Sequence, residues 1–131
     1  MVAVLVISEG KTAVEMLRGV KKVLGKRVLK GMEAICLKSS FTKRTLQSKL
    51  NKIINKHLEN DGVLILTDIY GSTQSNVCCS LLEKGQIELL SGYNMPMLIK
   101  AATLNQKSSL KELAKHLTDT GKKYIKHYKE Q

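Results

Sequence analysis

The sequence has few of the features that would place a protein in a membrane, in an oxidising compartment or in a metal-binding class. No apolar run approaches the roughly 20 residues needed to cross a bilayer. The cysteines, Cys36, Cys78 and Cys79, are odd in number and include an adjacent pair without Cys-x-x-Cys spacing. This pattern favours neither a disulfide framework nor a zinc site. We therefore expect reduced, packed thiols, no metal, no organic cofactor and no insertion into the membrane.

Aromatic and acidic residues are also scarce. The chain has one Phe, four Tyr and no Trp, and it contains no RNA-recognition signature. Its 22 Lys and Arg outnumber its 11 Asp and Glu, which gives a formal net charge of +11. Such a charge attracts nucleic acids or acidic partners, but a solvated lysine-rich surface is the simpler explanation. A basic nucleic-acid-binding module is therefore an alternative function, and we do not expect nucleic acid to be the main partner.

Several familiar catalytic motifs are missing. Residues 9–12 read Glu-Gly-Lys-Thr, but a P-loop requires a glycine where this chain has Leu5. No Gly-x-Gly-x-x-Gly follows a predicted strand, which argues against a dinucleotide site. The histidines, His57, His116 and His127, do not follow predicted strands, and no Ser-His-Asp set is visible. The sequence thus offers neither a nucleotide-binding loop nor an obvious hydrolytic centre.

The patterns that are present predict one α/β domain over residues 1–131. Hydrophobic residues make up 43% of the chain, which is enough for a core. Continuous apolar runs at 2–7 and 63–66 predict buried strands. Residues 32–37 predict a strand whose signal is weakened by Glu33, and residues 87–90 predict a short strand. Helical periodicity is found at 11–24, 46–58, 72–83, 97–104 and from 110 onward, with an interruption at Gly121. Residues 124–131 could form a strand or remain loose. The alternation predicts an open, mostly parallel sheet with helices on both faces.

Three segments at the ends of predicted strands could carry chemistry: 8–10, 68–73 and 91–94. In a parallel sheet these exits lie at one edge, where ligands bind. Free N–H groups at the helix starts there could hold a phosphate, although ordinary capping by Ser, Thr and Asp explains the pattern equally well. The candidate phosphate- or partner-binding residues are Ser8, Gly10, Tyr70, Gly71, Ser72, Thr73 and Asn94.

Two of these segments carry a more specific signal. They read LILTDIYGSTQSN and SGYNMPMLIKAATL, and the second contains Gly92, Asn94, Pro96, Met97 and Leu98 in a Gly-x-Asn-x-Pro-Met-Leu pattern. Over nearly its whole length the chain resembles the mannose/fructose/sorbose-type enzyme IIA domains of the bacterial sugar phosphotransferase system (PTS). The resemblance implies a cytoplasmic α/β domain that forms homodimers by exchanging an edge strand. The first residues, 1–7, are too short for a signal peptide and agree with that location.

The resemblance also implies a phosphoryl carrier in sugar transport. A histidine-containing phosphocarrier protein would phosphorylate a histidine at the end of the first strand, and enzyme IIB would then receive the phosphoryl group. This chain departs from that pattern, because residues 8–10 read Ser-Glu-Gly where Thr-His-Gly is usual. Glu9 stands in place of the phosphorylated histidine, Asp68 matches the carboxylate beside it, and Gln74 replaces a usual proline.

The exchange at Glu9 changes the expected chemistry. Two carboxylates ~4 Å apart repel by about 4 kcal/mol at an effective dielectric near 20, which corresponds to roughly a thousandfold in rate. Lys11, the helix N-termini or protonation of one carboxylate could relieve this repulsion. We expect phosphotransfer to be reduced or lost and the protein to be regulatory. The alternative is a working carrier that uses Glu9 or another residue, so transferase activity stays open.

Overall fold

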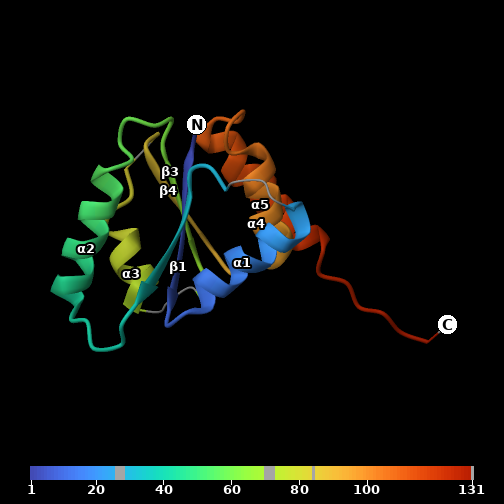
Figure 1. Cartoon of the computed structure of the whole chain (residues 1–131), viewed down its shortest axis with the longest axis horizontal. Helices are drawn as coiled ribbons and strands as arrows, with labels where there is room; N and C mark the ends of the chain where they lie inside the picture. The colour runs from blue at the N-terminus through green and yellow to red at the C-terminus, as the bar shows by residue number, and fades with distance from the viewer. Residues whose placement is uncertain (26–28, 70–72, 84, 131) are drawn as a thin grey trace.

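The computed structural model describes residues 1–25, 29–69, 73–83 and 85–130. Strands and helices alternate through most of the chain before two helices end it (Figure 1). The elements are β1 (Ala3–Glu9), α1 (Thr12–Leu24), β2 (Met32–Leu37), α2 (Lys43–Asn55), β3 (Val63–Thr67), α3 (Thr73–Cys79), β4 (Ile87–Ser91), α4 (Met95–Leu104) and α5 (Leu110–Lys123). Helices α2 and α3 cover one face of the sheet, and α1, α4 and α5 cover the other.

The sheet has the order β2-β1-β3-β4, and all of its pairings in the described part of the chain are parallel. This confirms the predicted open α/β architecture. The chain runs from β1 outward to β2, then crosses back to place β3 on the other side of β1. The direction of winding therefore reverses between β1 and β3. In open α/β sheets, ligands bind beyond the carboxyl ends of the strands at this switch point.

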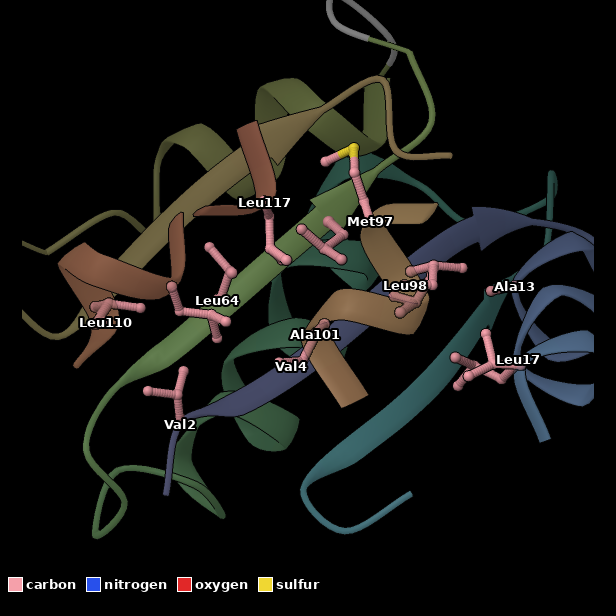
Figure 2. Close-up of a cluster of buried hydrophobic side chains, with 14 residues drawn as sticks. Val2, Val4, Ala13, Leu17, Leu64, Met97, Leu98, Ala101, Leu110 and Leu117 are labelled. Carbon is pink, nitrogen blue, oxygen red and sulfur yellow. The ribbon is translucent and has the colours of Figure 1, made fainter. Parts of the chain in front are cut away.

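Two hydrophobic cores explain why the central strands are apolar throughout. Val2, Val4 and Val6 point to the layer of α1, α4 and α5, and the alternate residues of β1 point to α2 and α3. Figure 2 shows the first core, in which side chains from β1 and β3 meet those of α4 and α5. Successive strand side chains point to opposite faces, so a strand covered on both faces needs an unbroken apolar run.

Three helices begin at side-chain caps that the local sequence provides. The side-chain oxygens of Thr42, Asn94 and Ser109 accept hydrogen bonds from backbone N–H groups three residues later, at 3.1–3.2 Å. At α5 the Ser109 hydroxyl also contacts the Glu112 carboxylate at 2.9 Å. Each cap satisfies an N–H group that has no partner within its helix. These caps fix where α2, α4 and α5 start.

The structure differs from the sequence prediction at the ends of several helices and at Gly121. Helix α3 ends at Cys79 instead of residue 83, and α2 begins three residues earlier than its apolar pattern suggests. The predicted interruption at Gly121 is wrong, because this residue lies inside α5. A Cβ atom there would lie 2.6 Å from the sulfur of Met97, so glycine allows α5 to approach α4 closely. Residues 124–130 form neither helix nor strand and lead away from the body of the protein (Figure 1).

Because the Cys78 thiol is buried, we expect the stability of the protein to fall at alkaline pH. Its side chain is fully buried, and burial together with the neighbouring Cys79 raises the pKa of Cys78 from 9.0 to about 12. The thiol stays neutral in the folded protein but ionises above pH 9 in the unfolded protein. Its contribution to the free energy of unfolding is therefore intact below pH 9 and is lost as the pH rises from 9 toward 12. We expect a loss of about 1 kcal/mol in the free energy of unfolding between pH 8 and pH 10.

Urea unfolding at several pH values tests this prediction. A Cys78→Val variant, which lacks the titrating thiol, should lose less stability over the same interval. An identical pH dependence in both proteins would assign the alkaline loss to other groups.

Candidate functional site

The candidate site lies at the carboxyl edge of the sheet, where β1 and β3 end. Ile7 is opposite Thr67 in the parallel pairing of these strands. The segments that carry Glu9 and Asp68 therefore leave the sheet side by side. Glu9 is exposed and Asp68 is partly buried. The fold thus brings both predicted catalytic positions to the switch point.

Ser8 has a structural role in holding the first of these segments. Its buried hydroxyl accepts a hydrogen bond from the N–H of Ala13 at 2.8 Å and donates to the carbonyl of Gly10 at 3.3 Å. The N–H of Gly10 donates to the carbonyl of Leu37 at 3.1 Å. Gly10 has φ +65°, which glycine adopts without steric cost. These bonds tie the end of β1 to α1 and β2 and fix the place from which Glu9 projects.

Glu9 lies in a shallow depression that also contains positive charge. Lys11 from the start of α1 and Lys38, Ser39 and Ser40 from the segment after β2 line the same depression. The sequence analysis considered Lys11 but missed the other three. The signal that could have found them is the pairing of β1 with β2, which places Leu37 opposite Glu9. The depression therefore combines one carboxylate with two ammonium groups and two hydroxyls.

Asp68 faces a different neighbour. One of its carboxylate oxygens accepts a hydrogen bond from the N–H of Ile69 at 2.8 Å. Burial, the charge of Asp68 and Cys36, in decreasing order, raise the pKa of Tyr93 above its ordinary value. The hydroxyls of Tyr93 and Thr67 are buried and have no hydrogen-bond partner among the described residues. Tyr93, which the sequence analysis did not select, is therefore part of the surroundings of Asp68.

Asn94 links the end of β4 to two helices. Its carbonyl oxygen accepts from the N–H of Met97 at 3.2 Å, and its amide nitrogen donates to the carbonyl of Gly121 at 3.2 Å. Both polar atoms thus serve the fold, and direct contact of Asn94 with a ligand stays a prediction. Thr73 begins α3. Tyr70, Gly71 and Ser72 lie outside the described residues, so their predicted roles stay predictions.

The three histidines lie outside the depression that contains Glu9. His57 follows α2 and lies 3.2 Å from the carboxylate of Glu33, near the amino end of β2 and away from the candidate site. His116 is exposed on α5, and His127 is in the segment after it. Within the described ranges, no three His, Cys, Asp or Glu side chains are grouped so that they could hold a metal ion, and no helix is long and apolar enough to cross a membrane.

Comparison with known proteins gives a consistent family. The family model described as EIIA-man, PTS system fructose IIA component, matches residues 3–118. A curated relative, the PTS system fructose-specific EIIA component of Bacillus subtilis (strain 168), is 32% identical over 75 residues. That match covers 56% of this chain and 51% of the relative, so it spans about half of the relative's length.

Solved structures share the fold at lower identity. The mannose/sorbose-specific IIA subunit of the phosphotransferase system from Enterococcus faecalis has a TM-score of 0.83 at 24% identity, covering 98% of this chain and 96% of that chain. The phosphotransferase system component EIIA from Streptococcus agalactiae also has a TM-score of 0.83, at 19% identity, covering 97% of both chains. A sigma-54 interaction domain protein from E. faecalis has a TM-score of 0.72 at 19% identity, with coverage of 93% and 90%.

The family model spans most of the chain, and solved phosphotransferase-system IIA structures share its α/β architecture. The chain therefore belongs to the EIIA-man family of the bacterial sugar phosphotransferase system.

Proposed function

We propose that this protein is a regulatory enzyme IIA homologue that does not carry a phosphoryl group at the usual position. The observation that carries the proposal is Glu9, which stands at the end of β1 beside the β3 exit with Asp68. By resemblance, this is the position of the phosphorylated histidine. The scaffold is retained, and the group that would carry the phosphate is replaced.

The chemistry of a carboxylate supports this interpretation. An imidazole nitrogen is a nucleophile near neutral pH, whereas a carboxylate would have to form an acyl phosphate. Glu9 instead gives the site a permanent negative charge. That charge loosely resembles a phosphorylated state, although a phosphoryl group carries about −1.5 to −2 at neutral pH. A partner would thus bind the negatively charged site without any phosphorylation of this protein.

A working phosphoryl carrier is the second candidate, and one observation favours it. Lys11 and Lys38 line the depression that contains Glu9, and ammonium groups attract the oxygens of an approaching phosphoryl group. They would offset part of the repulsion between that group and the carboxylates. In this case Glu9 or a histidine elsewhere would be modified.

Membership of the family supports proposals for the partners and the location of this protein. We propose the histidine-containing phosphocarrier protein and enzyme IIB as partners, a cytoplasmic location, and a role in sugar transport through contact with these proteins. The proposed complex places the exits of β1 and β3 against the partner, because this edge holds Glu9 and Asp68.

We also propose a homodimer in which residues 124–130 pair with β4 of a second copy. β4 is at the end of the strand order, and an edge strand offers unpaired backbone groups to an added strand. Leu89, Leu90 and Thr118 line a hollow between β4 and α5. In the final segment Ile125 lines this hollow in its own chain, and Tyr128 is exposed and would pack against such a hollow in a partner. Sedimentation of the full chain and of a variant ending at Lys123 tests this, since only the full chain should dimerise.

A phosphorelay assay tests the main proposal. The natural protein is mixed with phosphoenolpyruvate, enzyme I and the phosphocarrier protein, and its intact mass is measured under conditions that preserve phosphoramidates. We expect no phosphoryl group on the natural chain, and Glu9→Gln should weaken binding to the partner. A phosphorylated natural chain would favour the second candidate, and unchanged affinity of Glu9→Gln would remove the charge-based regulatory role.

A further inference from the structure

Helix α2 and the segments that flank it form a surface of one charge. Residues 34–58 contain no Asp or Glu, and they contain six of the 22 basic residues of the chain. These six are Lys38, Lys43, Arg44, Lys49, Lys52 and Lys56, and all six are exposed. Together they equal more than half of the formal net charge of +11. We call this set the α2 basic surface.

The helical geometry directs this charge away from the protein. Leu46, Leu50 and Ile54 form the buried face of α2. Residues three, four and seven apart share a face of a helix, so Lys49, Lys52 and Lys56 form a row on the solvent side. The ammonium group of Lys49 lies 5.2 Å from the centre of the Phe41 ring, a cation–π distance that helps to hold it in place. The row runs along a helix about 20 Å long.

Two basic residues of the opposite helical layer form ion pairs with acids. Arg18 is 2.7 Å from the carboxylate of Glu15, and Lys115 is 3.5 Å from that of Asp119. Among the described residues, no ion pair involves a side chain of the α2 basic surface. The positive charge of the α2 basic surface is therefore not compensated by an ion pair within the described part of the chain.

The composition of this surface indicates the class of partner. Its other exposed residues include Ser48, Asn51 and Asn55, and α2 has no exposed large apolar residue. The centre of a protein–protein interface is usually apolar and aromatic, and a helix on a membrane surface inserts apolar side chains. Nucleic-acid interfaces are polar, strongly positive and hydrated. Lys, Arg, Ser and Asn are all residues that contact phosphate oxygens.

We propose that the α2 basic surface binds the phosphate backbone of double-stranded nucleic acid. Phosphate contacts carry no sequence information of their own, so this binding is independent of base sequence. Lys38 also lines the depression that contains Glu9, but Lys49, Lys52 and Lys56 do not, so binding through these three can be tested apart from phosphotransfer. Sequence composition alone left the +11 charge without a location, and the structure places six exposed basic residues on α2 and the segments that flank it.

Fluorescence anisotropy with a labelled random-sequence DNA duplex tests this proposal between about 50 and 200 mM salt. If all six basic residues contact phosphates, the plot of log K against log salt should have a slope of about −5. The variant Lys49→Gln/Lys52→Gln/Lys56→Gln should make the slope shallower by about 3 and weaken binding at the lowest salt by at least about tenfold.

The matched control is Lys100→Gln/Lys111→Gln/Lys123→Gln, which removes the same charge from exposed positions on α4 and α5. It should keep the slope and affinity of the natural protein. Circular dichroism checks that each variant is folded. Absence of duplex binding at low salt, or an equal loss in both variants, overturns the proposal. Binding to phosphatidylserine vesicles without duplex binding would also overturn it and would assign the surface to a membrane.

Discussion

The variant Glu9→His is expected to accept a phosphoryl group from the phosphocarrier protein, and any modification of the natural chain should be roughly a hundredfold to a thousandfold slower. The thousandfold factor corresponds to the ~4 kcal/mol by which two carboxylates ~4 Å apart repel at an effective dielectric near 20. The hundredfold factor allows for Lys11 and Lys38, which line the depression with Glu9 and offset part of this repulsion. The new imidazole would lie beside the exit of β3, where Asp68 can stabilise its positive charge.

The initial rate of mass increase in the phosphorelay measures this effect. Glu59→His is a suitable control, because it exchanges an exposed glutamate for histidine away from the candidate site. It should behave as the natural protein. Adding Asp68→Asn to Glu9→His should lower the rate again. If Glu9→His also stays unmodified, the carrier protein no longer recognises this scaffold, and the proposed PTS partnership fails.

The variant Gly62→Ala is expected to lower the free energy of unfolding by about 3 kcal/mol. Two causes add at this residue. Gly62 has φ +113°, a conformation that costs other residues about 1–3 kcal/mol. A Cβ atom would also lie 2.9 Å from Leu110 and 3.2 Å from the carbonyl of Gln86, and overpacking typically costs about 1–3 kcal/mol. The carbonyl of Gly62 accepts a hydrogen bond from Ala3 at 3.0 Å, so the strain is placed where β1 and β3 begin.

Urea unfolding of Gly62→Ala and Gly92→Ala separates the two causes. Gly92 also has positive φ, at +77°, but a Cβ atom there would meet nothing within 4 Å. Its substitution should therefore show the backbone cost alone, at about 1–2 kcal/mol. A double-mutant cycle with Leu110→Ala should reveal coupling at Gly62. Equal losses at the two glycines and no coupling would contradict the steric part of the explanation.

The strands could be predicted from sequence because burial on both faces leaves a clear pattern. Residues 2–7 and 63–66 are continuously apolar, and the structure covers them with helices on both sides. The strand Met32–Leu37 was predicted with its observed bounds, although it contains Glu33. That residue is tolerated because β2 is at the edge of the sheet and the carboxylate reaches His57. A local pattern was therefore sufficient where burial is uniform.

Features that depend on contacts between distant segments could not be predicted in this way. Lys38 lies near Glu9 only because β2 pairs with β1. Tyr93 is within electrostatic reach of Asp68 and Cys36, which belong to other strand ends. Gly121 appeared to be a helix breaker, but its role depends on the position of Met97 in α4. Strand order, register and interhelical distance are tertiary properties, and a linear pattern does not encode them directly.

The order of the strands has a consequence for synthesis of the protein on the ribosome. β1 emerges first, but its pairing with β3 joins residues 60 positions apart, such as Ala3 and Val63. At about 5–20 residues per second, the ribosome needs several seconds to supply that partner. Until then β1 can pair only with β2, and its other edge is open to non-native partners. The strand at the centre of the finished sheet is thus the first to be made and among the last to be enclosed.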